Sequence, residues 1–208
     1  MPFINREDAA GQLARALSKF AGKHPLVLAV PRGAVPMGAI IATALGGDLD
    51  IVLVRKLGAP GNPELAIGAV DESGWTYLTP QAAMAGAYSE YVDRERTAQL
   101  EELRRRRARY TPGREAASAA GRWVIVVDDG LATGASMMAA LHAIRQQKPL
   151  HLVCAVPVAP PQTLERLRPF VDEIVCLEAP TQFHSVGQFY RDFPQVEDEQ
   201  VVAALNAR

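Results

Sequence analysis

Five short apolar runs divide this sequence, and within them polar and apolar residues do not alternate. Continuous apolar runs are typical of strands buried on both faces, as in parallel sheets covered by helices. Segments with helical patterns separate the runs. This order predicts an α/β fold, with a doubly wound, mainly parallel five-stranded sheet flanked by helices. The five runs are residues 26–30, 51–54, 124–127, 152–158 and 174–177.

Cap and turn signals mark the segments between the runs. Asn5 is a good N-cap for a first helix, and Asp198 is the expected cap of the last. Two stretches flanking residues 71–74 predict a hairpin, and residues 81–110 predict a long helix. The other predicted helices are 6–21, 36–45, 136–147, 163–168 and 198–207. The long helix carries a weak apolar stripe at Met84, Tyr88, Tyr91, Val92 and Leu100.

Composition narrows the class of protein. The 22 basic and 23 acidic residues among 208 leave a net charge of −1, which does not favour non-specific electrostatic binding to nucleic acid or anionic lipid. Neither a membrane-spanning run nor an apolar signal core near the first residues is found, so we expect a cytoplasmic protein. Cys154 and Cys176 sit in apolar runs and are expected to be reduced, buried thiols. A single bridge between neighbouring strands is the alternative.

The most informative stretch follows the third apolar run. Asp128 and Asp129 end the run, and a short loop with Thr133, Gly134 and Ser136 leads into a helix. A helix N-terminus offers free N–H groups to an anion, and the two hydroxyls add donors, so the loop is a candidate cradle for one phosphate. Ionised carboxylates accept hydrogen bonds only, which suits sugar hydroxyls or a hydrated cation. Together these groups indicate a sugar phosphate ligand. The alternative is a capped loop with solvated aspartates.

Residues 124–136 resemble the 5-phosphoribosyl-1-diphosphate (PRPP) motif of type I phosphoribosyltransferases, in the form found in adenine phosphoribosyltransferases. The resemblance implies that Asp128 and Asp129 bind the ribose hydroxyls. It implies that the 5′-phosphate binds at Ala132, Thr133, Gly134, Ala135 and Ser136. Over the whole chain, PRGAVPMG, VRKLGAPGNPELAIGAV and FYRDFPQV resemble uncharacterised bacterial stand-alone phosphoribosyltransferase-domain proteins. Gly130 departs from the motif, where a branched apolar residue is more usual, and is expected to loosen the loop.

Cations for the leaving diphosphate are expected just beyond the first two strands. Arg32 and Gly33 match the family's diphosphate loop, which often contains a non-proline cis peptide. Arg55 and Lys56 are similar to the basic pair that precedes the mobile loop in adenine enzymes. The carboxyl ends of parallel strands share one sheet edge, so these residues are predicted to lie near Asp128. For the basic pair alone, a solvated strand end is the alternative.

The resemblance implies a Mg²⁺-dependent transferase of nucleotide metabolism. It would transfer phosphoribose from PRPP to a nitrogenous base or related acceptor and release diphosphate. Mg²⁺ would be held mainly by PRPP, with Asp128 and Asp129 as candidate protein ligands and no dedicated metal cage. Residues 58–64 are the expected closing loop, and Glu64 is the candidate general acid or base, an exposed loop carboxylate being the alternative. Relatives are commonly homodimers, which makes a homodimer a candidate assembly.

A single domain, 1–208, is expected. Its core covers about 24–160, the insertion 62–115 and a C-terminal hood over the acceptor 178–208. Phe183 and Tyr190 lie in an aromatic cluster of the hood and are candidates for stacking on the acceptor, a small satellite core being the alternative. The arginine run 104–107 raises a second hypothesis, a non-catalytic PRPP-binding regulator or sensor that contacts RNA. A solvated helix face or an oligomer contact is the other interpretation of the run.

Overall fold

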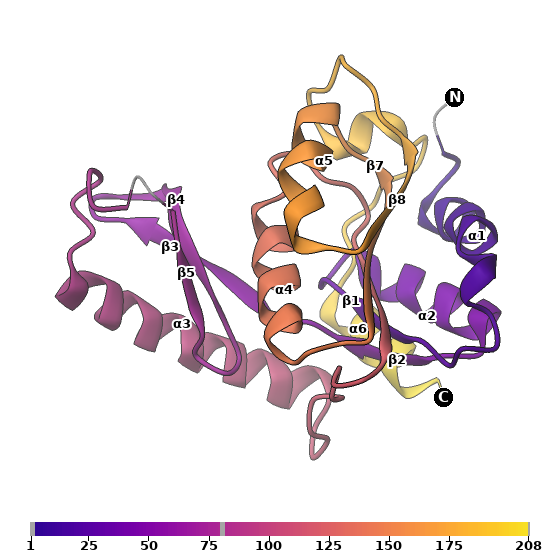
Figure 1. The fold of residues 1–208 in the computed structure, drawn as a ribbon, viewed down its shortest axis with the longest axis horizontal. Coiled ribbons are helices and arrows are strands. Elements are labelled where there is room, and N and C mark those ends of the chain that lie inside the picture. Colours follow the sequence, from indigo (N-terminus) through magenta and orange to yellow (C-terminus); the bar gives the residue numbers. More distant parts are fainter. Residues whose placement is uncertain (1–2, 80–81, 208) are drawn as a thin grey trace.

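The computed structural model describes residues 3–79 and 82–207 and contains a five-stranded parallel sheet with helices on both faces (Figure 1). The strand order is β2-β1-β6-β7-β8, so the chain crosses from β1 to its neighbour β6 only after a long insertion. The predicted α/β class is therefore confirmed. The strands are β1 (Leu26–Ala29), β2 (Asp48–Ile51), β6 (Trp123–Val127), β7 (His151–Val158) and β8 (Glu173–Glu178).

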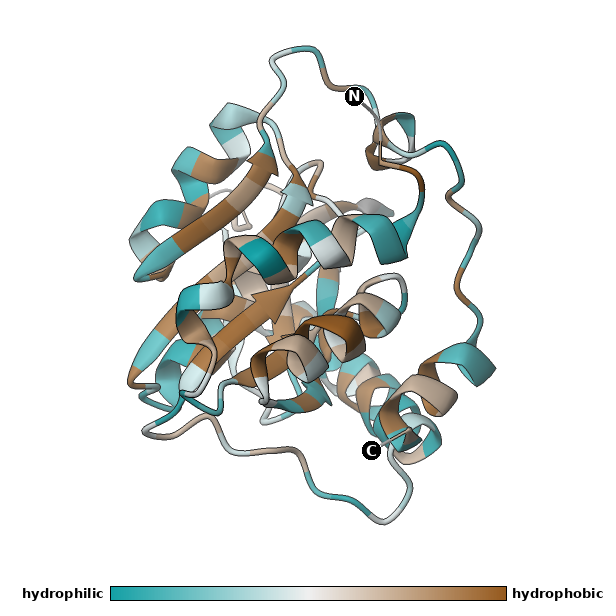
Figure 2. Cartoon of the chain, turned by 90° about the vertical axis from the view of Figure 1, so that its right-hand side faces the viewer, coloured by the Kyte–Doolittle hydropathy of each residue, from teal (hydrophilic) through white to brown (hydrophobic). Residues whose placement is uncertain are grey.

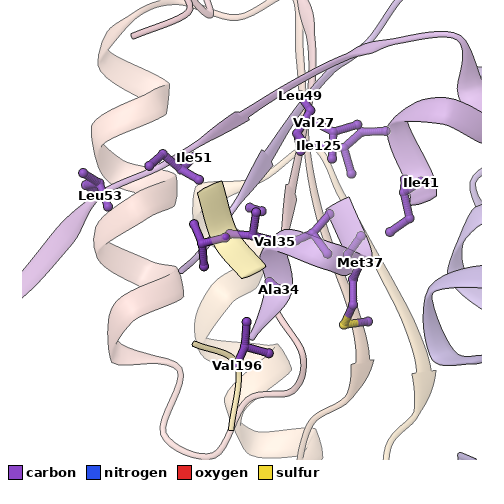
Figure 3. Close-up of a cluster of buried hydrophobic side chains, with 14 of the residues drawn as sticks. Val27, Ala34, Val35, Met37, Ile41, Leu49, Ile51, Leu53, Ile125 and Val196 are labelled. Carbon is purple, nitrogen blue, oxygen red and sulfur yellow. The ribbon is translucent and has the colours of Figure 1, made fainter. Parts of the chain in front are cut away.

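Two hydrophobic clusters on opposite faces explain why the central strands β1, β6 and β7 are almost wholly apolar. Val27 pairs in register with Leu49 on one side and Ile125 on the other, and all three point toward α2, as Figure 3 shows. The intervening strand residues, such as Leu28, belong to the cluster on the other face, beneath α4 and α5. Because both faces are covered, successive positions of the central strands are apolar. Figure 2 shows the strand arrows at the centre of the molecule as mostly brown.

The helices that cover the sheet follow the predicted alternation. On one face lie α1, α2 and the C-terminal α6, and on the other lie α4 and α5 (Figure 1). Their bounds are α1 (Arg6–Ala16), α2 (Ala34–Leu45), α4 (Ala135–Gln146), α5 (Pro161–Leu167) and α6 (Asp198–Asn206), with short 3₁₀ helices at Ser18–Phe20, Arg168–Phe170 and Val186–Phe189.

The helix caps agree with the sequence at one end of the chain and differ at the other. The Asn5 side chain accepts a hydrogen bond from the backbone of Asp8 at 2.9 Å, as predicted for the first cap. At α6 the cap is Glu197, which forms a capping box with Gln200, so Asp198 is the first helical residue and not the cap. A glutamate one position earlier reaches the free N–H groups as effectively.

The insertion forms a second, antiparallel sheet with one long helix, and it extends sideways from the main sheet (Figure 1). Its elements are β3 (Val54–Ala59), β4 (Asn62–Asp71), β5 (Thr76–Leu78) and α3 (Ser89–Tyr110). The hairpin predicted around residues 71–74 is confirmed by the β4–β5 pairing.

Two predictions in this region are wrong, those for the run 51–54 and for the start of the long helix, while the closing role of residues 58–64 stays a prediction. The run 51–54 is not one strand, because β2 ends at Ile51 and the antiparallel β3 begins at Val54. The expected closing loop 58–64 is largely the tight β3–β4 hairpin, with Ala59 paired to Asn62. The long helix begins at Ser89, so part of its predicted stripe precedes it: Met84 and Tyr88 are 89% and 73% exposed. Residue 81, where that helix was predicted to begin, lies outside the described residues.

Both cysteines are free, so the bridge between neighbouring strands is not formed. Cys154 is buried in β7, and burial raises the pKa of the Cys176 thiol in β8 to about 11. Both thiols are thus held in the uncharged, unreactive form. Within the described residues, every helix is too short or too polar to cross a membrane.

Candidate active site

A cleft of about 770 Å³ lies where the carboxyl edge of the main sheet meets the insertion, a size typical of small-molecule sites. Its walls come from four parts of the chain: the ends of β1 and β2, the β3–β4 hairpin, the inner face of α3, and the loop before α4. Polar lining residues are Arg55, Lys56, Glu95, Gln99, Arg106, Thr133 and Ser136, and the apolar ones include Val30, Pro31, Val52, Leu53, Val54 and Leu65.

The loop before α4 has the geometry of an anion site. Gly134 is the helix N-cap in the left-handed conformation, with φ of 73°, and provides no capping side chain. The first-turn N–H groups of α4 therefore have no acceptor within the helix, and the positive end of the helix dipole lies at the cleft. Thr133 and Ser136 are exposed and line the cleft beside these N–H groups. The arrangement suits one phosphate group.

The far side of the same loop is held by α5. Thr163, which is buried, donates its hydroxyl hydrogen bond to the Ala132 carbonyl at 2.7 Å. Arg166 donates to the Thr133 carbonyl at 3.0 Å. Because α5 binds the carbonyl oxygens, the loop is fixed without using its N–H donors. Neither residue could be predicted from the sequence, since both lie about thirty positions from the loop.

Arg55 and Lys56 reach the cleft, but from a different element than expected. Both belong to β3, an antiparallel strand that begins only two residues after β2, and they do not lie beyond the end of a parallel strand. The short connection keeps them near the carboxyl edge of the main sheet. Arg55 donates from Nε to the side-chain oxygen of Gln99 on α3 at 2.8 Å.

The two acids at the end of β6 have different surroundings. Asp129 forms an ion pair with Arg6 of α1, whose Nε and terminal nitrogen lie 2.9 and 2.8 Å from the same carboxylate oxygen. The Asp129 carbonyl accepts the Tyr190 hydroxyl at 2.6 Å. Gly33 approaches so closely that an added Cβ would lie 1.9 Å from Asp129 Oδ2. Asp129 is thereby enclosed, whereas Asp128 uses one oxygen to accept the Asp129 backbone N–H at 2.9 Å.

Burial and mutual repulsion shift the titration of this pair. Burial, followed by the charge of Asp129, raises the pKa of Asp128 well above its usual range. Burial also raises the pKa of Asp129, against the lowering effect of Arg6. Arg6 is the only cation that acts on the two carboxylates in the described structure, so ionising both of them lowers the stability of the fold. Such perturbed groups are typical of ligand-binding sites.

Arg32 and Gly33 lie in the segment between β1 and α2, and the peptide bond between Pro31 and Arg32 is cis. The Arg32 side chain does not line the cleft. It occupies a neighbouring pocket of about 310 Å³ and lies 3.6 and 3.7 Å from the carboxylates of Glu197 and Asp198. Of this segment only Val30 and Pro31 line the cleft, while the Arg32 guanidinium faces α6. The diphosphate contact of Arg32 and Gly33 stays a prediction.

Comparisons with known proteins agree with this geometry. The family model for the phosphoribosyl transferase domain matches residues 4–194. The chain belongs to the phosphoribosyl transferase domain family. Family membership confirms the resemblance inferred from the PRPP motif, and it covers the sheet, the cleft and the insertion.

Relatives in this family are similar over nearly the whole chain. "Putative phosphoribosyl transferase Rv0571c" of Mycobacterium tuberculosis H37Rv is 41% identical over 208 residues, which are 98% of this chain and 46% of the relative. The corresponding protein MT0597 of strain CDC 1551 has the same identity and coverage. The chain therefore spans about half the length of the curated relatives it matches. The crystal structure of TT1426 from Thermus thermophilus is 48% identical, covers 99% of this chain and 98% of its own, and has a TM-score of 0.87.

The aromatic cluster near the C-terminus packs on itself and does not line the cleft. Tyr190 is 6% exposed and stacks on Phe193 with ring centroids 4.6 Å apart. Phe183 packs against Phe189 at 5.2 Å. These rings do not form a separate satellite core: Tyr190 belongs to the main hydrophobic core, and the three phenylalanines pack against it. Arg6 also contacts the cluster, with its Cζ 3.7 Å above the Phe193 ring. These contacts leave the acceptor contact proposed for Phe183 and Tyr190 without a place in this cleft.

Gly130, the departure from the usual motif, has a structural reason. Its φ of 154° lies in the region that favours glycine, and an added Cβ would lie 2.4 Å from the Val186 side chain. The glycine admits the C-terminal segment close to the loop, so it serves packing and does not loosen the loop.

The arginine run on α3 is paired with carboxylates. Arg107 bonds to both oxygens of Glu72 at 2.7 and 2.6 Å and to the buried Asp50 at 2.9 Å. Arg105 and Arg106 both pair with Glu102. The Arg107 pairs attach α3 to Asp50 of β2 and to Glu72, whereas the Glu102 pairs lie within α3. This pairing favours a structural role over an RNA contact for the run.

Two further predictions concern catalysis and metal binding. Glu64 lies in β4, but its side chain lies outside the described part of the structure, so its role stays a prediction. Among the described residues, no group of three or more His, Cys, Asp or Glu side chains is arranged to hold a metal. Asp128 and Asp129 remain the candidate carboxylate ligands.

Proposed function

We propose that this chain is a transferase that binds PRPP in the cleft and transfers its 5-phosphoribosyl group to a nitrogenous acceptor, releasing diphosphate. The observation that carries the proposal is the placement of the α4 N-terminal loop and the basic residues Arg55 and Lys56 in the walls of one cleft. A ribose with a phosphate at C5 and a diphosphate at C1 can meet both groups at once. Family membership supports the same ligand.

Each wall of the cleft has a role in this proposal. The loop at Thr133 and Ser136 binds the 5′-phosphate, and Lys56 with the backbone near Pro31 binds the diphosphate. Asp128 does not line the cleft itself but follows the end of β6, just before the loop. From there we assign it the hydrogen bonds of the ribose hydroxyls and a negative charge near the carbon that becomes cationic. Positioned charges of this kind account for most of the rate enhancement when no covalent intermediate forms.

The residues present fit Mg²⁺ bound through the ligand. Arg6 contacts only Oδ2 of Asp129, and Asp128 accepts the Asp129 N–H on Oδ1, so each carboxylate keeps a second oxygen near the loop. Mg²⁺ ordinarily binds through one or two carboxylates plus phosphate oxygens. When bound with PRPP, Mg²⁺ would neutralise charge on the departing diphosphate. A site of this type needs no protein cage.

Calorimetric titration of PRPP, with Mg²⁺, into wild type and the Ala135→Glu variant tests the binding site. Ala135 is the first residue of α4 and is exposed, so a glutamate there is compatible with the helix dipole but repels a phosphate at the loop. We expect the dissociation constant to rise at least about tenfold, or roughly 1.4 kcal/mol. Gln146→Glu adds the same charge at the opposite end of α4 and is the matched control.

Two results would contradict the proposal: no binding of PRPP to wild type, or equal affinity in A135E and the control. Turnover is tested separately, by measuring diphosphate release from PRPP with a panel of purine and pyrimidine bases. Binding without release for any acceptor or water would identify a PRPP-binding sensor instead of an enzyme.

A further inference from the structure

The helix α3 brings two polar side chains into the cleft that no motif marks. Glu95 and Gln99 are separated by four residues, so they lie on one face of the helix, and both line the cleft. They are joined in a chain of hydrogen bonds. Arg55 donates to the Gln99 side-chain oxygen at 2.8 Å, and the Gln99 amide donates to Glu95 Oε1 at 3.0 Å.

The donor and acceptor order in this hydrogen-bond network determines which oxygen of Glu95 is left to accept from a ligand. Arg55 can only donate, which sets the orientation of the Gln99 amide, and that amide in turn donates to one oxygen of Glu95. No hydrogen bond to the second oxygen, Oε2, is found within the described residues. Glu95 is half-buried and is the one acidic side chain among the described residues that line the cleft. An oriented carboxylate oxygen is therefore left to accept from a ligand.

The rest of the cleft matches a flat nitrogenous ligand. Val52, Leu53, Val54 and Leu65 line it with apolar surface, which a ring can cover. The described residues lining it supply cations at Arg55, Lys56 and Arg106 and a carboxylate only at Glu95. The C-terminal aromatic cluster does not line the cleft, so α3 is the element that offers recognition of an acceptor.

We infer that Glu95 is a catalytic residue that binds an N–H group of the acceptor and takes its proton. This inference rests on the proposed function. The acceptor nitrogen forms a bond to C1 of the ribose as the bond from C1 to the diphosphate oxygen breaks, and diphosphate leaves with that electron pair. The proton released from nitrogen passes to Glu95 Oε2. The acceptor class is a planar, N–H-bearing base, and Gln99 and Arg55 hold the carboxylate in place.

The test compares Glu95→Gln with Glu101→Gln, an exposed glutamate of the same helix that does not line the cleft. For each variant and wild type, PRPP affinity is measured by calorimetry. Diphosphate release from PRPP is then measured with adenine, with ammonium chloride, and with water alone as the smallest acceptor. A general base contributes about 10²–10⁴-fold to a rate, so E95Q is expected to lower release about 100-fold or more. E101Q is expected to stay within about twofold of wild type on the same scale.

The two measurements separate this inference from the proposed function. PRPP affinity of E95Q within about twofold of wild type, with lost release, supports the role of Glu95, since a misfolded site would also lose the ligand. Release by E95Q equal to that of E101Q overturns the inference while the proposed function stands. A parallel loss of PRPP affinity in E95Q overturns it too, by assigning Glu95 to the PRPP site. A wild type that binds PRPP but releases no diphosphate to any of the three probes excludes the catalytic role. Failure of wild type to bind PRPP would contradict the proposed function itself.

Discussion

Replacing Arg6 by methionine removes the one ion pair that, among the described residues, compensates the acid pair at the end of β6. The Arg6 and Asp129 side chains are 10% and 16% exposed, and Arg6 also donates to the Pro194 carbonyl at 2.6 Å and covers the Phe193 ring. Methionine keeps much of the apolar stem but none of these polar contacts. The change therefore leaves Asp129 buried beside Asp128 without a cation.

The expected cost follows from these contacts. Breaking a buried ion pair by removing one partner costs about 3–5 kcal/mol, because the remaining charge stays desolvated. The cation–π contact adds about 0.5–2 kcal/mol, and part of the total is recovered if Asp129 takes up a proton. We expect the free energy of unfolding of R6M to fall by about 3–5 kcal/mol, a large share of the roughly 5–15 kcal/mol of a typical domain.

Urea unfolding at pH 7, followed by the fluorescence of Trp75 and Trp123, measures this change. Arg15→Met is the matched control, because Arg15 lies on the same helix and is exposed. It should cost less than about 0.5 kcal/mol. The double variant R6M/D129N, which removes both charges, should be more stable than R6M alone. A cost for R6M within about 1 kcal/mol of R15M, or no recovery in the double variant, would refute the argument from buried charge.

Two further substitutions test other charged groups. Asp128→Asn should raise the free energy of unfolding at pH 7, because the raised pKa of Asp128 means that its ionisation destabilises the folded state. The difference in free energy of unfolding between the variant and wild type should disappear as the pH falls toward about 4, where the unfolded chain also binds the proton. Urea titrations from pH 7 to 4 measure this difference. The same variant should bind PRPP more weakly in calorimetry. Arg107→Met should cost about 2–4 kcal/mol in thermal or urea unfolding, since Asp50 keeps its backbone partners but loses its nearest cation, whereas the exposed Arg105→Met should be nearly neutral.

Neighbouring residues in the chain made the phosphate loop readable from the sequence. The acids, the two hydroxyl residues and Gly134 are consecutive or nearly so, and a strand followed by a helix fixes their relative positions once both elements form. The apolar runs predicted the buried sheet for a similar reason, since burial on both faces requires each position to be apolar. The error at residues 51–54 arose because two buried strands adjoin there without a turn signal between them.

The surroundings of those residues could not be predicted in this way. Arg6 and Asp129 are 123 positions apart, and the contact between them depends on how α1 docks against the sheet. The same holds for the arginine run, whose composition suggested an exposed basic face until packing supplied Glu72 and Asp50 as partners. Whether a charged residue is exposed or paired depends on its neighbours in space, which the sequence alone does not show.

The sequence by itself determined the α/β class, the strand–loop–helix that forms the phosphate cradle, and the family, because each depends on local patterns. Only the tertiary structure decided which side chains face the cleft. It turned Arg32 toward α6, packed the C-terminal aromatic residues against the main core, and brought Glu95 of the insertion to the cleft. Those outcomes depend on the packing of elements distant in the chain, which no short-range pattern records.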